Sequence, residues 1–225
     1  MKTYCITIIT TCILCITACN STKQFTTNDN FCKENDPIFI ITKDEMRLDI
    51  EKYYNNETKS EGTIIIKDNA TFNQEYFKWK DGEVTNKQIN KQTNIGKWID
   101  YHPNGTIKSI SFIYLKGDVK INKRTYYDSI GNITKVIDYR QADKYPICYK
   151  EALKITEGLK RKRDSIFAIT RDSLVTDAKK TYVWKVFIDE PQDPEVTQHA
   201  KSWCYVISAQ TGKLIKKIKV TANPG

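Results

Sequence analysis

Histidine is scarce in this sequence, and the motifs of common enzyme classes are missing from it. Two histidines, His102 and His199, occur among 225 residues, and neither has a partner at the spacing of a metal site. No H-E-x-x-H, G-x-S-x-G or Walker A glycine loop is present. A cysteine–histidine nucleophile would need Cys148 or Cys204 beside His199, but the strand position of Cys204 favours burial. We therefore expect no enzymatic activity, no cofactor and no metal centre.

A hydrophobic run long enough to span a membrane is also missing. The apolar stretch at residues 5–18 is shorter than the roughly 20 residues that a transmembrane helix requires. It follows the basic residue Lys2 and ends in small residues, which indicates a secretory signal peptide over residues 1–18. The ending Ile16-Thr17-Ala18-Cys19 resembles the lipobox of bacterial lipoproteins. That resemblance implies cleavage before Cys19 and a lipid anchor on it; the alternative is a secreted protein in which Cys19 is incidental.

No acidic cluster follows Cys19, where the sequence reads Asn20-Ser21-Thr22-Lys23. Such a cluster is typical of surface-exported lipoproteins of some Gram-negative bacteria, and an aspartate at the place of Asn20 retains lipoproteins in the inner membrane of enteric bacteria. The resemblance therefore implies an outer-membrane protein that faces the periplasm. Residues 19–36 are rich in Asn, Thr, Ser and Lys, and we expect them to form a flexible tether behind the anchor.

Acidic residues are fewer than basic ones, which gives a formal net charge of +9. Removal of the signal peptide deletes Lys2 and leaves about +8. A basic surface favours docking to an anionic membrane. The expected partners are the membrane, through the lipid anchor, and another protein. We expect no nucleic-acid partner for an exported, anchored chain.

Cysteine becomes sparse once the signal peptide is removed. Four of the seven cysteines lie at or before position 19, including a C-x-x-C at residues 12–15 that is lost with the apolar stretch. Cys32, Cys148 and Cys204 remain, and an oxidising periplasm allows a pair to bridge. We predict the pair Cys148–Cys204, because both fall in the C-terminal unit. Three free thiols, two of them buried, are the open alternative.

Folded sequence is expected from Pro37, and residues 37–140 are expected to be rich in β-structure. The apolar run at residues 38–41 predicts a strand, and residues 63–66 predict another. Between them, Thr42 followed by Glu45 predicts a capping box ahead of a short helix that extends through Tyr53.

A weak internal repeat follows. The first copy ends in Tyr101, Gly105 and Ile107, and the second has Tyr127, Gly131 and Ile133 at an offset of 26 residues. Glycine supplies the positive φ that a tight hairpin turn requires, and aromatic side chains pack across neighbouring strands. The repeat therefore predicts successive β-hairpins.

The repeat residues resemble the MORN-type repeats of the YwqK family of antitoxins over about residues 76–139. The family motif is close to G-x-W-x-x-Y-x-x-x-G-x-(L/I), and the first copy matches it at Gly96, Trp98, Tyr101, Gly105 and Ile107. The second copy has Arg124 where the motif has tryptophan. The resemblance implies a repeat fold and an antitoxin-type protein that binds another protein.

Residues 146–220 form the predicted C-terminal unit. Apolar periodicity predicts a helix at about residues 147–161, and strands are predicted at residues 167–176, 182–189, 203–209 and 214–220. Trp184-Lys185-Val186 and the sequence YVISAQTGKLI at residues 205–215 resemble the PepSY-like family of small α+β domains. That resemblance implies a domain that binds or inhibits peptidases, and the same pattern overlaps with nuclear-transport-factor-like immunity proteins.

The expected fold is mostly β: MORN-like β-hairpin repeats followed by an α+β unit in which a helix packs on an antiparallel sheet. The expected function is that of a non-enzymatic envelope lipoprotein that binds a protein partner, with an immunity or antitoxin-type role as its sharper form. A peptidase-inhibitor-like protein and a structural spacer at the cell wall or membrane are the alternatives. Trp98 and Arg124 are the expected partner-binding residues, and His199 is the candidate on the long loop of the C-terminal unit. The competing interpretation buries Trp98 in the repeat core. The oligomeric state stays open.

Overall fold

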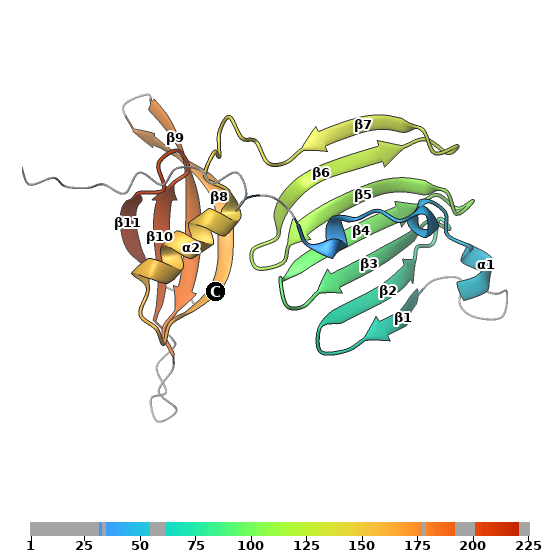
Figure 1. The fold of residues 1–225 in the computed structure, drawn as a ribbon, viewed down its shortest axis with the longest axis horizontal. Helices are drawn as coiled ribbons and strands as arrows, with labels where there is room; N and C mark the ends of the chain where they lie inside the picture. The colour runs from blue at the N-terminus through green and yellow to red at the C-terminus, as the bar shows by residue number, and fades with distance from the viewer. Residues whose placement is uncertain (1–31, 33–34, 55–61, 177–178, 192–200, 221–225) are drawn as a thin grey trace, which may run out of the picture.

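Two antiparallel sheets and a few short helices make up the fold (Figure 1). The computed structural model describes residues 32, 35–54, 62–176, 179–191 and 201–220. The larger sheet has seven strands in the order of the chain, β1 to β7, and the smaller one has the order β11-β10-β9-β8. The mostly-β class, with a helix packed on a sheet, is confirmed.

The seven-stranded sheet is a simple meander in which each strand pairs with the next one along the chain. Its strands are β1 (Gly62–Asp68), β2 (Phe72–Lys78), β3 (Val84–Asn90), β4 (Ile95–Tyr101), β5 (Ile107–Tyr114), β6 (Val119–Tyr127) and β7 (Ile133–Asp138). Residues 63–66, which we expected to form a strand, lie within β1.

The hairpin turn of the repeat occurs three times, in the two copies and at the Gly82 turn that precedes the first copy. Gly82, Gly105 and Gly131 have φ of 85°, 78° and 93° and close the turns β2–β3, β4–β5 and β6–β7. In each turn the glycine N–H donates to the carbonyl three residues before it, at 2.8–3.1 Å. Glycine is needed because side-chain-bearing residues rarely adopt this φ. All three hairpins therefore turn in the same way.

Residues 35–54, here called the N-terminal segment, cover one face of the seven-stranded sheet (Figure 1). The segment contains the 3-10 helices η1 (Pro37–Phe39) and η2 (Lys43–Met46) and the helix α1 (Ile50–Tyr53). The strand predicted at residues 38–41 is wrong. The Asp36 carboxylate accepts the N–H of Ile38, and Pro37 fixes a φ suited to the first helical position, so a tight helical turn forms instead.

The predicted capping box is confirmed at Thr42 and Glu45, but the helix behind it is split into η2 and α1. Glu45 also holds the segment to the sheet, because Lys97 Nζ lies 2.6 Å from its Oε1 and donates to Ile40 O at 2.7 Å. The Lys97 side chain is 2% exposed. Burial alone raises the pKa of Glu45, but the hydrogen bonds from Lys97, Thr42 N–H and Gln88 outweigh it and lower the pKa below its ordinary value.

The four-stranded sheet carries one helix, α2 (Tyr149–Leu159), near the predicted position. Its strands are β8 (Ser165–Thr176), β9 (Lys179–Asp189), β10 (Ser202–Ser208) and β11 (Leu214–Val220), and they overlap the four predicted strands. Ala152 and Ile155 of α2 are buried in the same core cluster as Trp184. Trp184 Nε1 donates to Ile147 O at 2.7 Å, which fixes the start of the helix against β9.

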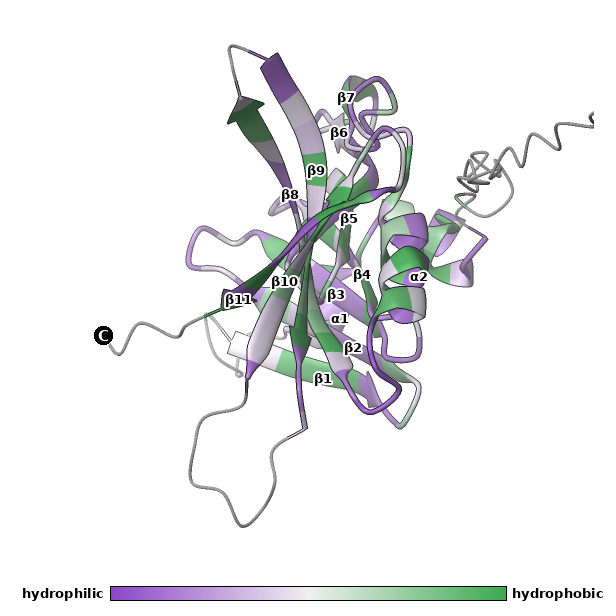
Figure 2. Cartoon of the chain, turned by 90° about the vertical axis from the view of Figure 1, so that its left-hand side faces the viewer, coloured by the Kyte–Doolittle hydropathy of each residue, from purple (hydrophilic) through white to green (hydrophobic). Residues whose placement is uncertain are grey.

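The two sheets share one hydrophobic core, although they are separate in hydrogen bonding. Tyr114 of β5 and Tyr149 of α2 pack with their ring centroids 5.0 Å apart. The β5–β6 turn meets β8, where Ile169 N–H donates to Lys116 O at 3.1 Å. Figure 2 shows the helix α2 to one side of the four-stranded sheet, whose strands carry hydrophobic stretches. Among the described residues, no helix combines the length and apolarity that crossing a membrane requires.

Candidate functional site

The face of the seven-stranded sheet opposite the N-terminal segment is here called the open face. Strand alternation places Asp100 of β4 opposite Ser109 of β5, which lies opposite Tyr126 of β6. The polar and aromatic side chains that make up this face are Phe77, Trp79, Thr85, Lys87, Trp98, Asp100, Ser109, Arg124 and Tyr126. Trp79 is 50% exposed, so aromatic surface is available there to a partner.

Trp98 lies flat on the open face instead of entering the core. A Cβ added to Gly96 would stand 1.7 Å from Trp98 Cζ3, so the indole occupies the space above the glycine. Residues two apart on a strand share a face, and glycine leaves room there for a close approach. Lys87 Nζ lies 5.8 Å from the centre of the same ring. Trp98 is half-buried, so the interpretation that buries it in the repeat core is wrong.

Arg124 reaches across two strands to the first copy of the repeat. Its Nη2 donates to Ser109 Oγ at 3.1 Å and lies 3.5 Å from Asp100 Oδ2. Its guanidinium stacks 4.7 Å from the centre of the Tyr126 ring. Trp98 and Arg124 thus lie on the same face with Asp100 between them, because Asp100 follows Trp98 by two residues on β4.

Asp100 is the centre of this polar network, although no sequence motif marked it as a site residue. Thr85 Oγ1 donates to Asp100 Oδ1 at 2.9 Å, and Ser109 Oγ donates to Oδ2 at 2.7 Å. Thr85 Oγ1 accepts in turn from Trp79 Nε1 at 3.0 Å. Trp79 was missed as well, although its position beside the Gly82 turn was a usable signal. Trp79 packs edge-on against Phe77, with ring centroids 4.4 Å apart.

Two of the predicted site residues, Cys19 and His199, lie outside the described residues. His102 is described and forms part of the Gly105 turn, where its N–H donates to Thr106 O at 2.8 Å. The structure therefore brings together Trp98 and Arg124 on the open face.

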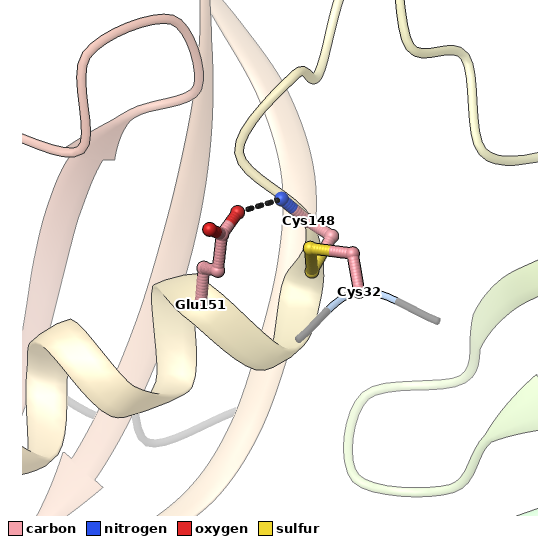
Figure 3. A group of neighbouring side chains, drawn as sticks. All are labelled: Cys32, Cys148 and Glu151. Atoms are coloured by element: carbon pink, nitrogen blue, oxygen red, sulfur yellow. Dashed lines mark hydrogen bonds between the residues drawn. A yellow bond between two sulfur atoms is a disulfide. The ribbon is translucent and has the colours of Figure 1, made fainter. Parts of the chain in front are cut away.

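The predicted disulfide Cys148–Cys204 is wrong, because Cys148 pairs with Cys32 (Figure 3). Cys148 stands at the N-cap of α2. Cys204 is a buried free thiol on β10 that packs with Val183 and Val206, away from the core cluster that holds α2. Burial raises the pKa of its thiol. The prediction assumed that two cysteines of the same C-terminal unit lie close together. Alternation along β10 instead points Cys204 to the face of the sheet away from α2.

The disulfide also fixes the end of the predicted tether. Cys32 is bonded to Cys148, and Asp36 accepts from Thr93 Oγ1 at 2.6 Å and from Asn90 Nδ2 at 3.1 Å. Residues 32 and 36, which we assigned to a flexible tether, are therefore attached to the folded part of the chain.

Glu151 lies beside the two sulfurs and gives the group Cys32, Cys148 and Glu151 the spacing of a metal site (Figure 3). The carboxylate is already explained by the helix, since its Oε2 accepts the N–H of Cys148 at 3.0 Å as part of a capping box. The sulfurs are bonded to each other, and a metal would require them as thiolates. This group is therefore a helix cap joined to a cross-link.

Comparison with known proteins returns nothing that describes this chain: no family model matches it, nor does a curated protein or a solved structure.

Proposed function

We propose that this protein is a non-enzymatic lipoprotein of the cell envelope that binds a protein partner through the open face. The observation that carries the proposal is the row of aromatic side chains held in place around Asp100, on a face that no described element covers. Aromatic residues and arginine are the side chains that most often anchor protein interfaces. Rings that are already fixed lose little conformational entropy when a partner binds.

The charges of the open face favour a protein partner over a polyanion. Lys87 lies 3.1 Å from Glu75, Lys108 pairs with Glu83, and Arg124 lies 3.5 Å from Asp100. Binding to nucleic acid or to an anionic membrane uses lysine and arginine that meet phosphates. Lys87, Lys108 and Arg124 already have carboxylate partners, so apolar contact and shape carry the recognition around Trp98 and Trp79.

The envelope location rests on the sequence around Cys19, and the immunity-type role rests on the two family resemblances. In this proposal the lipid on Cys19 holds the protein at the outer membrane, facing the periplasm, and the open face meets the partner there. An immunity or antitoxin-type protein needs only to occupy a surface of its partner, which a rigid sheet without reacting groups can do.

Variants of the open face test the proposal. The full chain is expressed in the bacterial envelope, cross-linked to its neighbours, and captured through a C-terminal tag. Trp79→Ala and Trp98→Ala are expected to lower the yield of the cross-linked partner by at least about tenfold, as loss of an interface anchor does. Phe167→Ala is the matched control, since Phe167 is 43% exposed on the other sheet. Mass spectrometry identifies and quantifies the captured protein.

Two results would contradict the proposal. A partner that all three variants capture equally would place binding elsewhere on the molecule. Absence of any specific cross-link would favour the structural spacer. A Cys19→Ala arm tests the anchor separately, because radiolabelled palmitate that still enters this variant would rule out lipidation at Cys19.

A further inference from the structure

A cavity of about 480 Å³ lies between the two sheets, away from the open face. Its walls come from β6, from the connection between β7 and α2, from the start of α2, and from β8 and β9. The volume falls within the range of small-molecule sites, roughly 300–1,000 Å³. Among the described residues, the side chains that line it include two arginines, Arg140 and Arg171, and no carboxylate. The cavity is therefore electropositive.

Arg171 is the cation that sets the character of this cavity. Its Nη1 donates to Lys120 O at 3.1 Å, and its Nε is buried with no hydrogen-bond acceptor. Within the described part of the chain, no carboxylate forms an ion pair with Arg171. Burial lowers the pKa of this guanidinium. Arg171 is half-buried, and a cation that is partly withdrawn from water without a counter-ion destabilises the fold, a cost that an anionic ligand would reduce.

Aromatic rings hold the Arg171 guanidinium in place. Its central carbon lies 5.3 Å from the centre of the Tyr145 ring and 5.2 Å from that of Trp184. The two rings pack on each other with centroids 5.0 Å apart, and Tyr145 donates to Asp172 O at 3.0 Å. Stacking leaves the planar fork of an arginine free to meet an oxyanion edge-on. The same rings give the cavity apolar walls.

We propose that this cavity binds a small organic anion, a molecule with one carboxylate or phosphate group on an aromatic or branched apolar body. The anionic group pairs with Arg171, and Arg140 adds a second cation, although Asp138 already pairs with Arg140. The apolar body packs on Pro146 and Ala142, the more exposed apolar residues of the lining, above the buried rings of Tyr145 and Trp184. Because Asn122 belongs to the seven-stranded sheet and Arg171 to the four-stranded sheet, the bound anion bridges the two units. Its binding therefore raises the stability of the whole molecule.

Calorimetric titration of the full chain in detergent tests this proposal with three probes. Benzoate presents a carboxylate, phenyl phosphate presents a phosphate, and benzyl alcohol is the neutral relative of both. We expect at least one anion to bind saturably and to raise the unfolding temperature, and benzyl alcohol to bind about tenfold more weakly or not at all. The stronger anion identifies which of the two groups the cavity prefers.

Variants assign the binding to the cavity. Arg171→Met keeps the length of the side chain and removes its charge, and it is expected to weaken anion binding by about tenfold or more. Ala142→Glu places a carboxylate at the wall of the cavity, at an exposed position that tolerates substitution. It is expected to abolish anion binding, and it leaves Arg171 in place, so it tests the cavity independently if the Arg171→Met variant does not fold. Ala142→Gln and Arg163→Met are the matched controls, because Arg163 is exposed and does not line the cavity.

Three results would overturn the proposal. The first is that neither anion binds the wild-type chain saturably, and the second is that benzyl alcohol binds as tightly as benzoate. The third is that Ala142→Glu leaves the affinity for the anion unchanged. None of these results depends on the open face, so failure here leaves the proposed protein partner untouched, and the reverse also holds.

Discussion

The hairpin turns of the two repeat copies have the same pairing pattern and different surroundings. Both have a register shift just before the tyrosine, at Tyr101 and Tyr127, and both pair that tyrosine with the isoleucine six residues later. Yet Ile107 is 0% exposed and Ile133 is 63% exposed. The N-terminal segment lies over the first copy and hydrogen-bonds to it, with Leu48 N–H donating to Gly105 O at 2.8 Å. The motif thus specifies the hairpin, while a segment outside the repeat decides which copy enters the core.

The difference between Trp98 and Arg124 follows from the residue two positions before each. Gly96 leaves space in which the Trp98 ring lies flat. The equivalent residue in the second copy is Asn122, with φ of 54°, at an irregular stretch of the β5–β6 pairing. Arg124 spans the distance to Asp100 and ties the second copy to the first. The departure from the motif therefore connects the two copies on the open face.

The largest expected loss of folding stability comes from a substitution in the Gly105 turn, which the N-terminal segment covers. A Cβ at Gly105 would stand 2.1 Å from the backbone oxygen of Leu48, whereas a Cβ at Gly131 meets nothing within 4 Å. Both glycines have positive φ, so alanine strains either turn by about 1–2 kcal/mol. Gly105→Ala adds a backbone clash and is expected to cost about 4 kcal/mol in all. Denaturant unfolding of the two variants measures the difference, and equal losses would show that the N-terminal segment does not hold the first copy.

A somewhat smaller effect is expected from the paired isoleucines. Ile107→Ala empties a fully buried site and should lower the free energy of unfolding by about 3 kcal/mol. Ile133→Ala trims an exposed side chain and should change it by no more than about 0.5 kcal/mol. The same unfolding assay checks both. A large loss for Ile133→Ala would mean that the second copy is covered in solution, for example by a second molecule.

The smallest effect is expected from acid, which should weaken the Lys97–Glu45 pair that holds the N-terminal segment to the first copy of the repeat. The pKa of Glu45 is lower in the folded chain than its ordinary value, so its contribution is fully present above the unfolded value of about 4.3. The contribution is lost as the pH falls through the folded pKa. A charged hydrogen-bonded pair of this kind contributes on the order of 2 kcal/mol.

Unfolding experiments between neutral and acid pH test this contribution. The stability gap between wild type and Glu45→Gln should narrow as the pH falls. Glu51→Gln, at an exposed position on α1, is the control and should follow the wild type at every pH. A gap of constant size would show that the Lys97–Glu45 pair is not what titrates.

Local signals were sufficient for much of the fold. The Thr211-Gly212 turn, between the strands predicted at residues 203–209 and 214–220, predicted the β10–β11 hairpin, and Gly105 and Gly131 predicted the β4–β5 and β6–β7 hairpins. The failure at residues 38–41 has a local cause as well. The apolar run looked like a strand, but Asp36 and Pro37 form a better helix start. Capping chemistry overrode the apolar pattern there.

The sites depended on contacts that no local pattern encodes. Cys32 and Cys148 are 116 residues apart, and their pairing follows from where the N-terminal segment lies. Arg124 and Asp100 meet because β4, β5 and β6 are adjacent in the meander. The repeat motif predicted that Trp98 and Arg124 lie on the hairpin sheet, but it did not predict the polar contacts around Asp100 that connect them. The cavity around Arg171 is lined by five separate stretches of the chain, so only the assembled fold reveals it.

The Cys32–Cys148 cross-link also determines how the molecule would carry mechanical load. A pull applied between the chain before Cys32 and the chain after Cys148 passes through the sulfur–sulfur bond straight into α2. The residues between the two cysteines, which include every strand of the seven-stranded sheet, form a closed loop that bears no tension. If the lipid proposed on Cys19 holds the chain in a membrane, a pull on the C-terminal unit would load the four-stranded sheet and leave the open face unchanged in shape.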